Sequence, residues 1–198
     1  MERAWSTSDG TQELGTLFPG QLLSSDQSTA QFLLRHAVHQ AREAVRKRSG
    51  GPFGAVIVRR LPAAIDESRQ PLVEVVAVSH NRVLELQDPT AHAEMVATRE
   101  AARHLQRRDL SDCELYTSCY PCPMCYCAVI WAKIPRFWYA SESEDAAMAG
   151  FDDAKLHQHF RSSQGVVGLK EERVYLAEHQ MPFKEYIEAL RQGFTELY

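Results

Sequence analysis

The sequence predicts a layered α/β fold in which helices pack on a central sheet. Short apolar runs rich in β-branched residues recur along the chain, for example from Phe53 to Arg59 and from Val73 to Ser79. Longer segments with apolar residues at helical spacing alternate with these runs. The 198 residues include 44% hydrophobic and 24% charged residues, a composition typical of one globular domain with a sizeable core.

The domain begins after an N-terminal segment of different composition. Residues 1–27 are rich in Ser, Thr, Gly and Gln with scattered apolar residues, so we predict a poorly ordered leader there and a single domain over residues 28–198. The first helix is expected from Ser28, because Ser28-Thr29-Ala30-Gln31 has the capping-box pattern and apolar residues follow at helical spacing. Gly50-Gly51-Pro52 ends this helix.

Two strands joined by a long loop follow the first helix. The runs from Phe53 to Arg59 and from Val73 to Ser79 have the composition of buried strands. Residues 61–71 between them contain two prolines and several polar residues. We therefore predict a hairpin whose loop, an insertion over residues 61–72, is exposed.

The second half of the chain continues the alternation. Asp88-Pro89-Thr90 predicts a turn with a cap that starts a helix over about residues 91–107. A strand over residues 113–118 leads into another helix, with Pro121 and Pro123 in the first turn, where helical amides are unpaired anyway. The remaining predicted elements are a strand over 136–140, a short helix near 153–160, a strand near 173–177 and a final helix near 182–192.

Composition narrows the class of protein. The sequence contains no apolar run of membrane-spanning length and no signal-peptide pattern at its start, so we expect a cytoplasmic protein without a membrane partner. The formal charge of -4 and pI near 6.1 favour a small substrate over nucleic acid. Basic residues cluster between Arg42 and Arg48 and between Arg103 and Arg108, and solvated helix faces are the simpler account of both clusters.

The cysteines indicate a metal. Three of the five cysteines lie between residues 122 and 127, too close together for a disulfide framework. Cys122 and Cys125 are spaced to share one face of a helix near its N-terminus, where the macrodipole favours the thiolate that binds metal. His92 is the natural third ligand, since a catalytic zinc site takes three protein ligands and keeps one open position.

Glu94 gives this group of residues its chemistry. Glu94 lies two residues after His92, so in a helix its side chain is turned away from the face that carries His92. This position suits a group that acts on water instead of binding the metal. Either half alone has a simpler explanation, because C-x-x-C motifs occur in structural zinc and redox sites and a single His is usually not a ligand. Together, His92-Ala93-Glu94 and Pro121-Cys122 to Cys125 match the H-x-E and P-C-x-x-C signature of zinc-dependent nucleobase deaminases.

From about residue 31 to the C-terminus, the chain resembles the cytidine deaminase-like superfamily, and within it the bacterial-type guanine deaminases. Gly51 to Val58, Asn81, Asp88 to Glu94 and the Cys122 segment are shared with tRNA adenosine deaminases. The segment from Asp145 to Asp153, with Asp145-Ala146-Ala147 and Gly150-Phe151-Asp152-Asp153, is what favours a guanine-type base.

The resemblance implies a three-layer α/β/α cytidine deaminase-like fold, with a mixed sheet of about five strands and helices on both faces. It implies one Zn²⁺ per subunit and a homodimer, in some relatives with exchanged C-terminal segments that cover the partner's active site. Tyr120 stands where relatives usually have Glu, and Cys127 where Gly or Ala is common; we expect altered packing at both. The implied site residues are the zinc ligands His92, Cys122 and Cys125, the proton shuttle Glu94, and the substrate-binding residues Phe53, Asn81, Ala93, Asp153 and Tyr198.

The expected reaction is hydrolysis of guanine to xanthine and ammonia, with water as co-substrate. Glu94 would move a proton from water to the ring nitrogen, and the Asp153 carboxylate would accept hydrogen bonds from the guanine edge and carry the second proton. A guanosine deaminase and a tRNA adenosine deaminase are the alternatives within enzymes. A silent zinc-binding subunit that serves a partner enzyme is disfavoured, since Glu94 is present.

Overall fold

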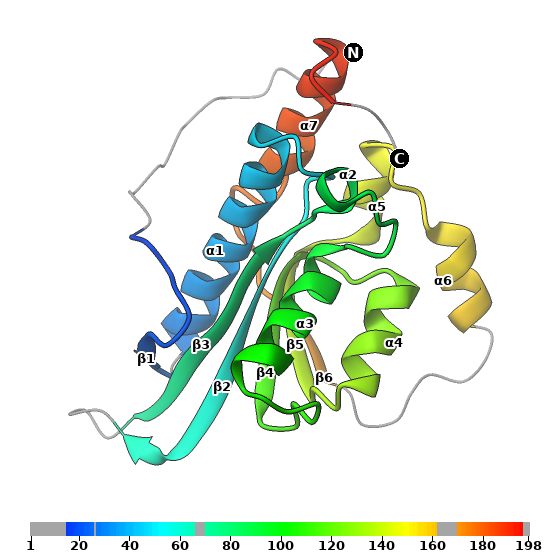
Figure 1. Ribbon diagram of the computed structural model, residues 1–198. Helices are drawn as coiled ribbons and strands as arrows, with labels where there is room; N and C mark the ends of the chain where they lie inside the picture. Colours follow the sequence, from blue (N-terminus) through cyan, green and yellow to red (C-terminus); the bar gives the residue numbers. More distant parts are fainter. Residues whose placement is uncertain (1–14, 26, 66–69, 162–169, 196–198) are drawn as a thin grey trace.

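A six-stranded mixed sheet forms the centre of the molecule, in the order β1-β3-β2-β4-β5-β6 (Figure 1). The computed structural model describes residues 15–25, 27–65, 70–161 and 170–195. The strands are β1 (Leu22–Ser24), β2 (Gly54–Ile65), β3 (Pro71–His80), β4 (Cys113–Cys119), β5 (Arg136–Ser141) and β6 (Lys170–Arg173). The helices are α1 (Gln27–Arg46), α2 (Val83–Leu86), α3 (Ala93–His104), α4 (Pro123–Trp131), α5 (Ser143–Met148), α6 (Ala154–Arg161) and α7 (Met181–Arg191).

Strand direction decides where the loops gather. β2 is antiparallel to both of its neighbours, β3 and β4, whereas β4, β5 and β6 run parallel to one another. β3 and β4 therefore run in the same direction and end at the same edge of the sheet. The segments that follow them lead into α3 and α4, so the N-termini of these two helices meet at that edge (Figure 1).

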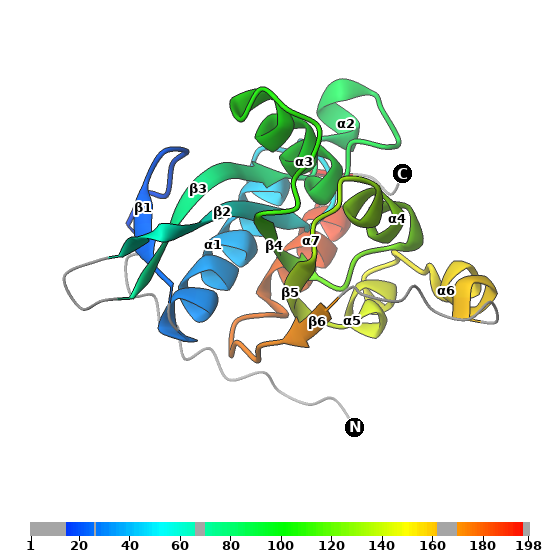
Figure 2. The ribbon, with the colours of Figure 1, turned by 90° about the horizontal axis from the view of Figure 1, so that it is seen from below.

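Helices cover both faces of the sheet, as predicted. Successive side chains of β2 point to opposite faces. Ala55 and Ile57 join a core cluster with residues of α3 and α4, whereas Val56 and Val58 join a second cluster with residues of α1. α7 packs beside α1 on the second face (Figure 2). The three-layer α/β/α architecture is confirmed, with six strands in place of about five.

The additional strand lies in the segment predicted as a leader. β1 pairs antiparallel with β3, Leu22 opposite Glu74. Leu17, 8% exposed, and the partly buried Leu23 belong to the core cluster on the α1 face. The scattered apolar residues of this segment therefore anchor its C-terminal part to the domain. Residues 1–14 of the predicted leader lie outside the described residues.

The predicted loop of the hairpin is shorter than expected. β2 continues to Ile65 and pairs there with Pro71, the first residue of β3, so seven of the residues assigned to the insertion, 61–65 and 71–72, are strand. The register shifts between Leu61 and Ile65, around Pro62, because proline has no amide hydrogen to donate to the ladder. The two prolines that suggested a loop instead mark an irregular strand and the first residue of β3.

Other element boundaries also differ from the prediction. α2 and α5 were not predicted, because helices this short show no apolar periodicity. A strand was predicted near 173–177, but β6 ends at Arg173. Val174 and Leu176 instead pack into the core on the α1 face, which explains why this segment is apolar.

One glycine sets the distance between α1 and the sheet. A Cβ atom on Gly54, the first residue of β2, would lie 2.1 Å from the backbone oxygen of Ala37 and 2.6 Å from the backbone nitrogen of Ala41. The Gly54 amide donates to Ser118 Oγ at 3.0 Å, which joins the start of β2 to the end of β4. The edge of the sheet where the helix N-termini meet is thus held by close backbone packing. In the described part of the chain, no helix combines the length and apolar character needed to cross a membrane.

Candidate metal centre and active site

The three predicted metal ligands meet at the N-termini of α3 and α4. His92 and Cys122 are the N-cap residues of these helices, both with extended backbone (φ -61°, ψ 155° and φ -61°, ψ 162°). Pro123 begins α4, and Cys125 follows in its first turn, so both sulfurs face the same point. His92 Nδ1 lies 3.5 Å from Cys122 Sγ and 3.6 Å from Cys125 Sγ.

These distances fit a tetrahedral metal ion. With Zn–N and Zn–S bonds of about 2.0 and 2.3 Å, tetrahedral geometry separates a nitrogen ligand from a sulfur ligand by about 3.5 Å. Within the described residues, this is the cluster of three potential ligands whose atoms all lie within 4.8 Å of one another. The donor set of two soft sulfurs and one imidazole nitrogen suits zinc.

The other cysteines do not share the environment of these two. Burial is the main factor that raises the pKa of Cys113 to about 12 and the pKa of Cys119 well above its ordinary value. In contrast, hydrogen bonds from Cys125 and His92 hold the pKa of Cys122 at about 4, against an opposing effect of burial. Cys127, two residues beyond Cys125, is exposed. Cys122 therefore has thiolate character, whereas the hydrogen bond to Cys122 and burial raise the pKa of Cys125 well above its ordinary value.

Glu94 lies beside the ligand cluster in the first turn of α3. Its side chain is 5% exposed, and Oε2 is 3.6 Å from Cys125 Sγ. Burial, with the nearby charge of Cys122, raises the pKa of the Glu94 carboxyl. Thr117 of β4 donates to Glu94 Oε1 at 3.3 Å. Thr117 was not among the predicted site residues, and its place just before the Cys-rich loop is the only signal that the sequence offers.

Asn81 lies at the end of β3 and is fully buried. Its side-chain oxygen accepts hydrogen bonds from the backbone amides of Gly51, at 3.3 Å, and Val83, at 3.1 Å. A Cβ atom on Gly50 would lie 2.0 Å from this oxygen, so the glycine leaves room for the amide group. The acceptor of Asn81 is thus engaged within the protein. A substrate contact by this side chain would use its amide NH₂ as a donor, whereas the sequence suggested that it could use both.

Phe53 precedes β2 and contacts two other aromatic rings. Its ring lies edge to face with Phe151, at 5.0 Å between centroids, and with Phe183 of α7, at 5.9 Å. Phe151 and Phe183 were not predicted as site residues. Ala93, predicted to bind substrate, has its side chain buried in the core under α3, so only its backbone could serve that role. Tyr198, also predicted to bind substrate, lies outside the described residues.

Asp153 immediately precedes α6 and is half-buried. Its Oδ2 lies 3.0 Å from His157 Nε2. Burial raises the pKa of the Asp153 carboxyl, His157 opposes that shift, and the charge on Cys122 adds to it. The charge of Cys122 therefore acts on this predicted substrate-binding residue, although burial and His157 have the larger effects.

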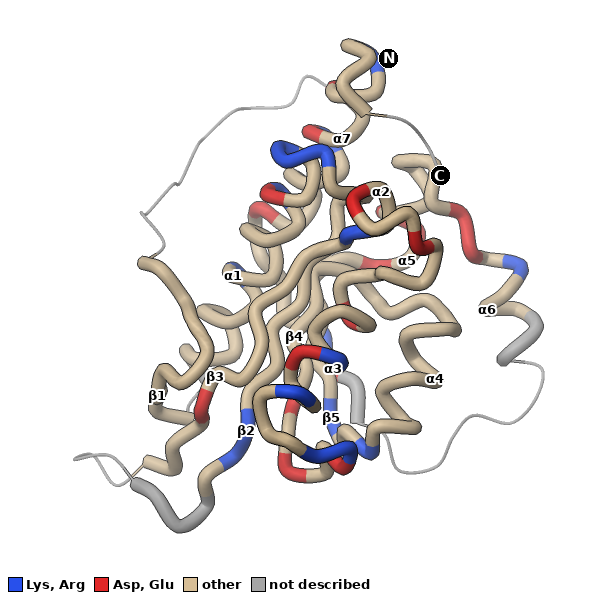
Figure 3. The backbone as a smooth tube through the Cα atoms, in the orientation of Figure 1, with Lys and Arg blue, Asp and Glu red and all other residues tan. Residues whose placement is uncertain are grey.

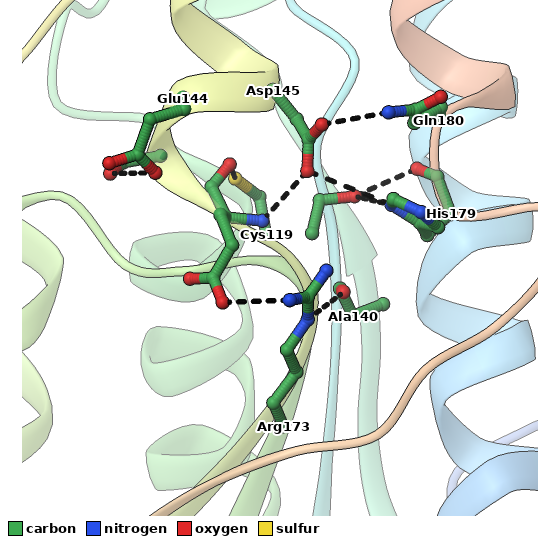
Figure 4. A network of polar contacts seen from close by, with 10 residues as sticks. Cys119, Ala140, Glu144, Asp145, Arg173, His179 and Gln180 are labelled. Atoms are coloured by element: carbon green, nitrogen blue, oxygen red, sulfur yellow. Dashed lines mark hydrogen bonds and ion pairs between the residues drawn. The ribbon is translucent and has the colours of Figure 1, made fainter.

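Asp145, from the motif that precedes the Asp153 segment, connects α5 to α7. Figure 4 shows its carboxylate at the centre of a polar network between α5 and α7. It accepts from the Glu142 amide at 3.0 Å, as half of a capping box for α5, and from Gln180 Nε2 at 2.9 Å. His179 Nδ1 lies 3.7 Å away. This network fixes α5 against the start of α7, which places Phe151 beside Phe53.

Comparison with known proteins agrees with this geometry. The family model for the cytidine and deoxycytidylate deaminase zinc-binding region matches residues 27–141. The guanine deaminase of Bacillus subtilis is 41% identical over 153 residues, which cover 77% of this chain and 90% of that protein. A tRNA-specific adenosine deaminase of Aquifex aeolicus is 36% identical over 111 residues, which cover 56% of this chain and 65% of that protein.

Solved structures of deaminases share the fold. The crystal structure of guanine deaminase from Bacillus subtilis superposes with a TM-score of 0.56 at 38% identity, covering 85% of this chain and 95% of that one. A protein crystallised with 2,6-diaminopurine gives a TM-score of 0.65 at 25% identity, covering 85% of each chain. With the ligand cluster, the buried glutamate and these matches, the chain belongs to the cytidine and deoxycytidylate deaminase zinc-binding family.

Proposed function

We propose that this protein is a zinc-dependent guanine deaminase that hydrolyses guanine to xanthine and ammonia. The observation that carries the proposal is the buried Glu94 carboxylate beside the His92, Cys122 and Cys125 cluster, in a chain 41% identical to a guanine deaminase. The choice of guanine as substrate is further supported by Asp153, a half-buried carboxylate that can accept hydrogen bonds from the N1–H and exocyclic NH₂ of guanine.

One zinc ion per subunit is part of the proposal. His92, Cys122 and Cys125 would hold it, and bound zinc would lower the pKa of a water molecule and polarise it for attack. Two thiolates cancel the formal charge of the metal. The site therefore depends on a separate base, and Glu94 is the carboxylate in reach.

Glu94 is the proton carrier of the proposed reaction. It takes a proton from the attacking water, whose oxygen bonds to guanine C2, and gives that proton to the adjacent ring nitrogen. The hydroxyl on C2 then gives up its proton, the C2 carbonyl forms, the bond from C2 to the exocyclic amine breaks, and the amine leaves as ammonia with that second proton. Because burial raises the pKa of Glu94, the carboxyl can hold the proton between these steps.

Three other residues would orient the base. Asp153 presents an acceptor that matches the N1–H and exocyclic NH₂ donors of guanine, and it would carry the second proton to the leaving amine. Asn81 would donate from its amide NH₂ to an acceptor on the purine. Phe53, held by Phe151 and Phe183, would offer its ring to the face of the base.

Ammonia release by the purified, zinc-loaded protein tests the proposal. We expect release from guanine and none from guanosine, adenine or cytosine. Release from guanosine alone would overturn the substrate and keep the roles of the metal ligands and Glu94. If none of the four compounds releases ammonia and the protein instead forms inosine in a tRNA anticodon substrate, the proposal would be replaced by tRNA adenosine deamination, the activity for which its tRNA-specific relatives are named.

Glu94→Gln tests the proton carrier. Glutamine has nearly the same shape but cannot accept the proton, so we expect kcat to fall at least about a hundredfold. Bound zinc, measured by atomic emission, should remain at the wild-type level, because Glu94 is not a ligand. Full turnover with bound zinc would remove Glu94 from the mechanism.

The proposal includes a cytoplasmic homodimer that acts on a small purine, with no nucleic acid or membrane partner. α4 is apolar all round, and the exposed part of its surface includes Trp131, 90% exposed, and Cys127. A helix that is hydrophobic on every side is usually covered. Light scattering should give twice the chain mass. Trp131→Glu should yield monomers, and a monomeric wild type would contradict the dimer.

A further inference from the structure

α6 is an exposed helix with one buried side chain in its described part. Figures 1 and 2 show it beyond α4 and α5, away from the central sheet. Its N-terminal half, from Ala154 to Gln158, is exposed except for His157, whose relative exposure is 9%. His157 is therefore the main anchor of this half of α6 on the domain.

The His157 ring contacts both the loop that precedes Cys122 and the Asp153 carboxylate. Its centroid is 5.6 Å from the ring of Tyr120, which is two residues before the ligand Cys122. Tyr120 itself packs edge to face against Tyr139 of β5 at 5.1 Å, so the surface under His157 is part of a packed aromatic cluster. On its other side, His157 Nε2 is 3.0 Å from Asp153 Oδ2.

The two consecutive aspartates before α6 have different partners. Asp152 is exposed, and its Oδ1 accepts from the Ala154 amide at 3.0 Å, which satisfies one amide of the first turn. Asp153 does not serve the helix in this way. Its carboxylate is directed to His157, one helical turn ahead, and its charge acts on both Cys122 and His92.

We propose that His157 is a positioning residue that holds the Asp153 carboxylate at the substrate side of the metal centre, with Tyr120 as the platform for its ring. The inference rests on the proposed function in one respect, the role of Asp153 in binding the purine. A half-buried carboxylate without a cationic or donor partner would turn toward solvent, because burial disfavours its charge. His157 supplies that partner, with Nε2 3.0 Å from Asp153 Oδ2.

Two substitutions separate the two functions of His157, ring packing on Tyr120 and polar contact with Asp153. His157→Phe keeps an aromatic ring on Tyr120 but removes the nitrogen near Asp153. His157→Gln removes the ring but keeps a donor at a similar reach. His104→Phe, at a surface histidine 39% exposed at its side chain and paired with Glu74 instead, is the matched control.

We expect His157→Phe to lower kcat/KM roughly ten- to a hundredfold, the scale for a misplaced catalytic group, with bound zinc unchanged. His157→Gln should recover most of this loss, and His104→Phe should behave as wild type. Combined with Asp153→Asn, His157→Phe should cause no further loss, because both changes remove the same interaction. Wild-type kinetics for His157→Phe, equal loss in both His157 variants, or additive losses with Asp153→Asn would overturn the proposal.

A second measurement does not depend on the reaction. Urea unfolding of the wild type, both single variants and the double variant, all zinc-loaded, measures the Asp153–His157 contact in the free protein. The double variant should shift the unfolding midpoint by less than the sum of the single shifts. Additive shifts would refute the contact even in an active enzyme. If the shifts were non-additive in a protein that is inactive on guanine, the positioning role of His157 would stand and guanine would be rejected as the substrate. Kinetics on the other purines would then identify the true substrate.

Discussion

At the scale of single residues, Thr117 shows how the sheet supports the chemistry. It is fully buried at the end of β4, and its hydroxyl donates to Glu94 Oε1 at 3.3 Å. This bond fixes one carboxylate oxygen, so the other is directed toward the ligand sulfurs. A proton carrier works only when its oxygen is placed within hydrogen-bond reach of water and substrate.

Replacing Thr117 by valine should therefore impair catalysis without loss of the fold. Valine has the same shape and lacks the hydroxyl, so we expect kcat to fall about tenfold while KM and bound zinc change little. Steady-state kinetics on the deaminated base measure both constants. Thr117→Ser keeps the hydroxyl and should retain most activity; an equal loss in the serine variant would assign the effect to packing of the methyl group.

Sequence patterns predicted some of these residues and not others, for a physical reason. His92 and Glu94 lie two residues apart at the start of α3, and Cys122 and Cys125 lie three apart at the start of α4, so local geometry groups each pair. The H-x-E and P-C-x-x-C signature then joins the two pairs. Thr117 reaches Glu94 only through the pairing of elements that are distant in the chain. The pattern Asp152-Asp153 carries no sign of which carboxylate caps the helix and which turns inward.

At the scale of elements, the contact between α1 and β2 depends on Gly54. Gly54→Ala would place a methyl group within 2.1 Å of the Ala37 oxygen and 2.6 Å of the Ala41 nitrogen, and both are backbone atoms that cannot move alone. We expect a loss of about 1–3 kcal/mol in the free energy of unfolding, the scale of an overpacked core. Urea unfolding measures it. Gly15→Ala, with nothing within 4 Å of the added Cβ, is the control and should be neutral.

α1 also carries a buried histidine that makes stability depend on pH. Burial, with a smaller effect of His39, lowers the pKa of His36 from 6.5 to about 4. Its ring is 2% exposed and lies 4.6 Å from the Phe32 ring. In the unfolded chain His36 binds a proton near pH 6.5, whereas in the folded protein it does so only near pH 4. The stability that it contributes is therefore complete above pH 6.5 and declines as the pH falls toward 4.

Unfolding in urea at pH 7, 5.5 and 4.5 tests this dependence. The wild type should lose up to about 3 kcal/mol to His36 across that range, at about 1.4 kcal/mol per pKa unit. His36→Phe keeps a ring against Phe32 and cannot be protonated, so its loss should be smaller by that amount. Identical pH profiles would show that acid acts elsewhere, for instance on the metal ligands, which both proteins share.

Element boundaries were predictable where local signals agree with tertiary packing. The start of α4 follows from Pro123, whereas Pro121, also predicted in its first turn, lies before the helix. α1 follows from its apolar spacing, although it starts at Gln27 and the predicted cap Ser28 lies inside it. β1 was not predictable from composition, because three residues become a strand only when β3 provides the partner edge. Residues 174–176 gave the opposite error, because a strand was predicted there and none was found. Burial under α1 and pairing in a sheet favour the same apolar residue types.

At the scale of the whole molecule, the ligand cluster joins two units of the fold. His92 belongs to the segment after β3, and Cys122 and Cys125 to the segment after β4, while β2 lies between these strands. A metal ion held by all three would cross-link the two units at the edge of the sheet. It would also offset the cost of burying Glu94 and the Cys122 thiolate close together.

Metal removal should therefore destabilise the whole domain and not only abolish activity. An ion that binds the folded state and has no preformed site in the unfolded chain stabilises by its binding free energy. We expect chelation to lower Tm by at least about 5–10 °C, since each kcal/mol corresponds to about 2–4 °C at this chain length. Calorimetry of the zinc-loaded and chelated protein under reducing conditions measures the shift.

Two variants serve as controls. In His92→Ala the shift on chelation should be largely lost, because one of three ligands is gone. Cys127→Ser should keep the shift in full, because that exposed cysteine lies outside the ligand set. An unchanged Tm in the wild type would mean that the two units are held together by the sheet alone, and a reduced shift in Cys127→Ser would mean that the ligand set is assigned wrongly.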